Sequence, residues 1–97
     1  MVDPKALSVK ASEMAEKAAK KDGVSQEDNK YTDYLTDALM EISNEVSYED
    51  GLAYMIEHPK ALKFTIDERT IDPNSTTVAE LVQEVMYMAI VYEGANS

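Results

Sequence analysis

The chain has no cysteine and no tryptophan, and only one histidine in 97 residues. Without cysteine it forms no disulfide and has no thiolate chemistry. The single histidine, His58, has neither a cysteine nor a second histidine with which to build a typical zinc site. The three glycines, Gly23, Gly51 and Gly94, are too dispersed for a phosphate-binding loop. We therefore expect no metal, no cofactor and no enzymatic activity.

Long apolar runs and basic residues are also scarce. No run approaches the ~18 apolar residues of a membrane-spanning helix, and the first ten residues lack the apolar stretch of a signal peptide. Nine basic residues stand against nineteen acidic ones, for a net charge of −10. Because phosphate contacts need lysine and arginine, we expect no direct binding to nucleic acid or to an anionic membrane. These features predict a cytoplasmic protein whose natural complement is a basic protein surface.

The apolar content of 44% is sufficient for a hydrophobic core. Six methionines and six tyrosines are many for this length, so the core would combine them with leucine, isoleucine and valine. A chain of this size is near the usual size of one domain, and we expect residues 1–97 to form a single acidic helical domain.

Residues 77–92 form the stretch around which the rest is expected to pack. Thr77 and Glu80 fit the capping box that opens a helix, and Gly94 lies where a helix stop is expected. Residues 85–92 carry no charge, so a helix here is apolar on every side and needs cover. One interpretation is a central helix wrapped by the others. Another is an oligomer or partner interface, formed by Tyr87, Met88 and Val91. A strand also fits this β-branched and aromatic run, although the capping box favours a helix.

Start and stop signals predict three further helices. Asp3-Pro4 is a typical helix start, Ser47 begins a second capping motif, and Pro59 ends the helix before it. Gly51, inside the third of these segments, weakens its helical preference by ~1 kcal/mol. We predict an all-α bundle of about four helices, over residues 4–22, 30–46, 48–57 and 77–92.

Residues 60–71 are ambiguous. Leu62, Phe64 and Ile66 alternate with polar residues, which predicts a short extended segment over residues 62–66. The alternative is a short helix starting at Pro59, which would place Leu62 and Ile66 one turn apart. The alternation favours the extended segment.

Acidic residues recur every four positions along the second predicted helix. A carboxylate row at this spacing forms a continuous ridge, with ~6 Å between neighbours. No basic residue lies between Tyr31 and His58 to offset it. The simplest interpretation is a solvated face that keeps the chain soluble. The functional interpretation is a partner-binding surface, made by Asp33, Asp37, Glu41, Glu45, Glu49 and Asp50.

Two functions follow as hypotheses. The first is a non-enzymatic adaptor or inhibitor that presents the acidic face to a basic partner. A nucleic-acid-handling enzyme is one such partner, since the carboxylates could stand in for phosphates. The second is a structural or assembly subunit that self-associates through the apolar C-terminal helix.

Overall fold

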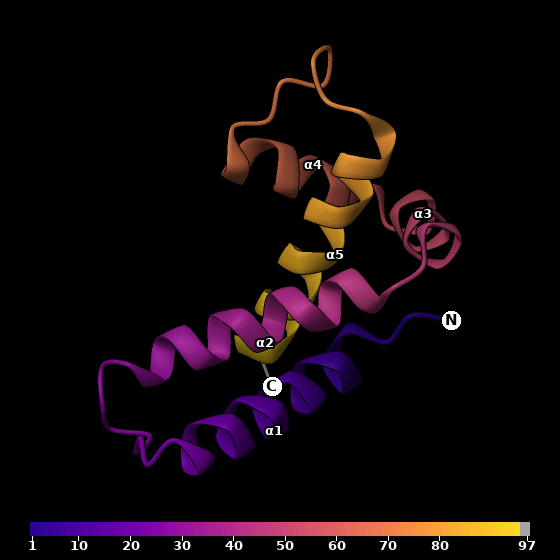
Figure 1. The fold of residues 1–97 in the computed structure, drawn as a ribbon. Helices are drawn as coiled ribbons and strands as arrows, with labels where there is room; N and C mark the ends of the chain where they lie inside the picture. Colours follow the sequence, from indigo (N-terminus) through magenta and orange to yellow (C-terminus); the bar gives the residue numbers. More distant parts are fainter. Residues whose placement is uncertain (96–97) are drawn as a thin grey trace.

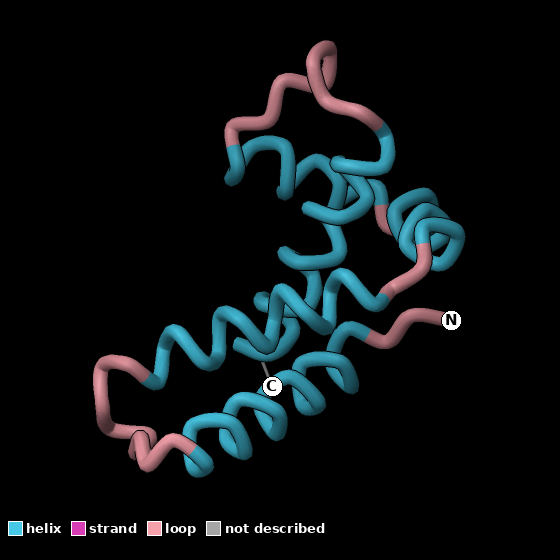
Figure 2. Tube along the Cα trace, in the orientation of Figure 1, coloured by secondary structure: helices cyan, strands magenta, loops and turns pink. Residues whose placement is uncertain are grey.

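The computed structural model describes residues 1–95, and all regular secondary structure within that range is helical (Figures 1 and 2). The prediction of an all-α fold is confirmed, although residues 1–95 form five helices rather than about four. The helices are α1 (Pro4–Lys21), α2 (Tyr31–Glu45), α3 (Tyr48–Glu57), α4 (Pro59–Arg69) and α5 (Val78–Ala95).

Short polar side chains begin three of these helices as predicted. Asp3 accepts a hydrogen bond from the backbone N–H of Ala6 at 3.3 Å, with Pro4 as the first residue of α1. The Ser47 hydroxyl accepts from the N–H of Asp50 at 3.2 Å, and the Thr77 hydroxyl accepts from that of Glu80 at 3.1 Å. Each cap satisfies a backbone donor that the helix leaves unpaired, which typically stabilises by ~1 kcal/mol.

The predicted extended segment over residues 62–66 is wrong, because this segment forms the middle of α4. Pro59 both ends α3 and serves as the first residue of α4, where its missing N–H costs nothing. Thr65 is fully buried, and its hydroxyl donates to the Ala61 carbonyl at 2.8 Å. Ala61 and Leu62 pack against the cluster that α5 forms with Met55, so the helix places its apolar residues on the rest of the fold.

The N-terminal pair, α1 and α2, forms an antiparallel hairpin (Figure 1). The buried side of α1 consists of small residues at helical spacing, which lets α2 approach closely. These residues are Ser8, Ala11, Ala15 and Ala19.

Helix α5 contacts each of the other four helices, so its predicted central position is confirmed. Its first half packs Val82, Val85 and Met86 against α3 and α4, including Met55. Its second half places Ile90 in a separate cluster with α1 and α2. The molecule is elongated, 43 × 27 × 22 Å, and α5 runs from α3 and α4 to the hairpin of α1 and α2 and contributes to both clusters (Figure 1).

The helix stop predicted at Gly94 is wrong, since α5 continues through it to Ala95. Gly94 lies instead against Ser8 of α1, where a Cβ atom would overlap the serine hydroxyl. The glycine therefore permits the close crossing of α1 and α5.

Candidate functional site

The acidic ridge lies along the exposed side of α2. Asp33, Asp37, Glu41 and Glu45 are all solvent-exposed and follow one another at single-turn intervals. Carboxylates at this spacing repel one another, each neighbouring pair costing a few tenths of a kcal/mol. Asp33 lies in the first turn, where it favours the positive end of the helix, but the rest of the row adds charge that does not stabilise α2 itself.

Only one end of this row meets a cation. Glu45 Oε2 lies 3.8 Å from Lys10 Nζ of α1, and both side chains are exposed. Across residues 1–95, Asp33, Asp37 and Glu41 have neither an ion pair nor a side-chain hydrogen bond. Three successive turns of α2 thus present carboxylates that water alone solvates.

The two remaining predicted acids, Glu49 and Asp50, lie in the first turn of α3. Asp50 and Glu45 line the same hollow of about 450 Å³ beside the N-terminal residues, whereas Glu49 lies outside it. Acids in a first turn also stabilise the positive end of a helix. Asp50 therefore extends the ridge, while both acids have a structural role in α3.

The structure does not gather Tyr87, Met88 and Val91 into one exposed face. Met88 is only 7% exposed and belongs to the interior, so it offers almost no surface to a second copy. Tyr87 and Val91 are half-buried.

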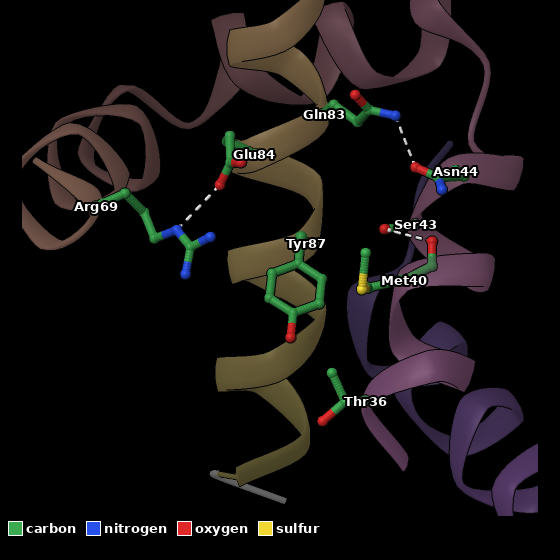
Figure 3. Close-up of a pocket in the computed structure, with 8 residues that line it drawn as sticks. All are labelled: Thr36, Met40, Ser43, Asn44, Arg69, Gln83, Glu84 and Tyr87. Atoms are coloured by element: carbon green, nitrogen blue, oxygen red, sulfur yellow. Dashed lines mark hydrogen bonds and ion pairs between the residues drawn. The ribbon is translucent and has the colours of Figure 1, made fainter. Parts of the chain in front are cut away.

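Tyr87 lines a groove that the sequence did not predict. The groove lies between α2, α4 and α5 and has a volume of about 420 Å³. Figure 3 shows the Tyr87 ring lying on α5 between Arg69 on the α4 side and Met40 on the α2 side. The Arg69 guanidinium carbon is 6.0 Å from the ring centroid. Thr36 lines the groove beyond Met40.

Two polar contacts hold the helices around this groove. Arg69 Nε donates to Glu84 Oε2 at 3.0 Å and joins α4 to α5. Gln83 Nε2 donates to Asn44 Oδ1 at 2.6 Å and joins α5 to α2. These pairs connect residues far apart in the sequence, so no local pattern could have predicted them.

Two tyrosines have perturbed acidity. The pKa of Tyr34 is raised, chiefly because its hydroxyl donates to Asp22 at 2.6 Å, an interaction that joins α2 to the end of α1. The pKa of Tyr54 is raised by burial and, to a smaller extent, by the charge of Glu93. Both shifts favour the protonated phenol, so neither tyrosine is activated as a base.

His58 links α3 to α4. Its Nδ1 lies 2.8 Å from the Tyr54 carbonyl oxygen, and its ring stacks on that of Tyr54 with centroids 4.0 Å apart. Among the described residues, no group of three or more acidic or histidine side chains is arranged to hold a metal ion. None of the helices in this range is both long and apolar enough to cross a membrane.

Comparisons with protein-family models, with curated proteins and with solved structures give no match for this chain, so its function has to be argued from the ridge and the groove themselves.

Proposed function

We propose that this chain is a non-enzymatic, cytoplasmic binding protein that presents the acidic ridge of α2 to a basic surface on a partner protein. It acts as an adaptor, or as an inhibitor that occupies the partner's lysines and arginines. Where those residues normally hold nucleic acid, the carboxylates compete with phosphates for them.

The observation that carries this proposal is the row of unpaired carboxylates on an exposed helix. Asp33, Asp37 and Glu41 repel one another, and none of them forms an ion pair within residues 1–95. Most of the chain's basic residues lie elsewhere, since residues 23–58 carry one lysine against nine acids. The cations of a basic partner would be attracted to each of these carboxylates, and this attraction would offset their mutual repulsion.

Charge reversal at the centre of the ridge tests the proposal. The double variant Asp37→Lys/Glu41→Lys should lose at least 90% of the partner captured from a lysate at 0.1 M salt, because lysines would face the partner's basic groups. Wild-type capture should itself fall sharply at 1 M salt, where the screening length shrinks from ~10 Å to ~3 Å.

A matched control is available on α1. Glu13→Lys/Glu16→Lys makes the same change in net charge at two exposed acids outside the ridge. This control should capture the partner as the wild type does, and circular dichroism should show all three proteins equally helical. Equal loss in both variants would mean that only net charge matters, and unchanged capture by the ridge variant would exclude the ridge.

Self-association through α5 is the second candidate, and the half-buried Tyr87 and Val91 are the residues left to support it. Light scattering at high concentration should then report an oligomer that Val91→Asp disrupts. A monomer throughout would remove this candidate.

A further inference from the structure

The acidic ridge and the groove share one rim. On α2, Thr36, Met40 and Asn44 line the groove. Each follows a ridge acid by three residues, namely Asp33, Asp37 and Glu41. Residues three apart are neighbours on a helix surface. The two rows therefore run parallel along α2, with the carboxylates beside the opening of the groove.

Met40 and Tyr87 give the groove an adaptable apolar contact, whereas its other six lining residues are polar or charged. Met40 is 51% exposed, although it lies against a cavity in which a partner side chain could cover it. Methionine adjusts to irregular partners, and the amphipathic ring of Tyr87 suits a half-wet interface. The volume of about 420 Å³ lies within the range of ~300–1,000 Å³ typical of ligand sites.

The charges at the rim select the occupant. Arg69, the cation that lines the groove, is already engaged by Glu84 at 3.0 Å. Asp33, Asp37 and Glu41 remain unpaired along the neighbouring row. A phosphate, an acidic peptide or an anionic lipid would meet these carboxylates and be repelled. A partner segment that carries lysine or arginine beside an apolar side chain can pair with the ridge acids and place its apolar side chain in the groove.

We propose that the ridge and the groove together bind one basic amphipathic helix of a partner protein. Its basic residues lie over Asp33, Asp37 and Glu41, and an apolar side chain enters the groove between Met40 and Tyr87. A helix matches the site because it presents groups at the same one-turn spacing as α2. The three acids from Asp33 to Glu41 span eight residue steps, or ~12 Å along the helix, so three to four turns of partner helix suffice. This inference rests on the proposed function and adds that the partner binds through a basic amphipathic helix.

A pair of synthetic peptides provides the probe. Both are 16-residue helices with the same lysines and arginines, and one carries a row of leucines where the other carries glutamines. Fluorescence anisotropy with the full chain should show the leucine peptide binding at least tenfold more tightly at 0.1 M salt. It should also retain measurable affinity at 1 M salt, because apolar contact is not screened.

Two substitutions that leave the net charge unchanged locate the apolar contact. Met40→Gln should reduce the advantage of the leucine peptide to less than threefold, and it should fold normally because Met40 is exposed. Ile56→Gln is the matched control, because Ile56 on α3 is 70% exposed and does not line the groove. This control should leave the tenfold advantage intact.

Each contrary outcome has a distinct meaning. Equal affinity for the two peptides, abolished by Asp37→Lys/Glu41→Lys, would overturn the role of the groove and leave the charge-based function standing. If neither peptide binds at 0.1 M salt, the proposed function fails and this inference fails with it. A leucine advantage that survives Met40→Gln would place the contact elsewhere. Dimerisation that Met40→Gln disrupts would make a second copy the occupant and overturn the proposal.

Discussion

Helices α1 and α4 end in the same type of turn, but a different residue holds the left-handed position in each. After α1, Gly23 adopts φ of 72°, and the N–H of Val24 donates to the Ala19 carbonyl at 2.8 Å. After α4, Thr70 adopts φ of 53°, and the N–H of Ile71 donates to the Ile66 carbonyl at 3.0 Å. This turn needs the left-handed conformation, which glycine adopts freely and a β-branched residue does not.

Replacing Thr70 by glycine should therefore stabilise the protein. The left-handed conformation costs an L-residue roughly 1–2 kcal/mol, part of which is offset by the greater freedom of glycine when unfolded. We expect Thr70→Gly to raise the free energy of unfolding by about 1 kcal/mol in urea titrations. Gly23→Thr is the reciprocal control, since nothing lies within 4 Å of its missing Cβ, and it should destabilise by a similar amount. A lower urea midpoint for Thr70→Gly would contradict this explanation.

Gly51 shows how a residue that weakens a helix can be required by packing. It is buried where α3 crosses α5, and a Cβ atom there would lie 2.5 Å from Val82 Cγ1 and 3.3 Å from Met86 Cγ. The local preference for alanine, ~1 kcal/mol, competes with this overlap. Since the neighbours are themselves buried, the overlap prevails.

Gly51→Ala should consequently lower the free energy of unfolding by about 1–3 kcal/mol, the usual cost of overpacking. Thermal and urea unfolding measure the change. In a Val82→Ala background the space is available, so the same substitution should cost far less there. A double-mutant cycle without coupling between the two positions would refute the steric explanation.

At the scale of single helices, Asp37 and Glu41 add repulsion to α2, whereas Asp33 in its first turn favours the positive end of the helix. Asp37→Lys would replace two repulsive neighbours by attractive ones, with Asp33 and with Glu41. Each such pair is worth ~0.2–0.5 kcal/mol, so the variant should be about 1 kcal/mol more stable at low salt.

The same variant should bind the partner more weakly, which separates folding from function. Unfolding midpoints and capture assays on one preparation measure both properties. Lys30→Gln is a control at an exposed position next to α2 that should change stability little. Should Asp37→Lys lose stability together with binding, the ridge would be part of the fold rather than a surface kept for a partner.

The elements differ in how far sequence determines them. Capping signals are local, so the starts of α1, α3 and α5 could be predicted from Asp3, Ser47 and Thr77. Alternation over five residues fits both a strand and a helix, and the packing of Ala61 and Leu62 against the cluster that contains Val82 and Val85 of α5 decides for the helix. That contact joins distant parts of the chain.

Of the two parts of the candidate site, the ridge could be predicted from the sequence and the groove could not. Helical periodicity placed Asp33, Asp37 and Glu41 on one exposed side of α2, as the structure has them. The groove depends on Arg69 meeting Glu84 and Asn44 meeting Gln83, pairs that are 15 and 39 residues apart. No pattern within one helix contains that information.

For the whole molecule, the division of the interior into two clusters matters most. Ile42 and Ile90 belong to one, Met55 and Met86 belong to the other, and α5 contributes to both. Because neither cluster is complete without α5, both ends should unfold in a single cooperative transition.

Truncating either cluster tests this coupling. Ile90→Ala should cost about 2–5 kcal/mol. It should lower the unfolding midpoint equally whether followed through Tyr34 at one end or Tyr54 at the other, for example by NMR. Met55→Ala, in the opposite cluster, should do the same. Separate transitions for the two tyrosines would show that the clusters fold independently.

The order of the helices, in which α5 follows the four helices that it joins, also governs how the protein folds as it is made. A nascent chain that has emerged from the ribosome only as far as Thr77 contains four helices and no α5, so both apolar clusters are still open. At ~5–20 residues per second, synthesis of the 18 residues of α5 leaves them open for another ~1–4 s. During that interval the partial chain exposes apolar surface of the kind that chaperones and proteases recognise, and its protection depends on the arrival of α5.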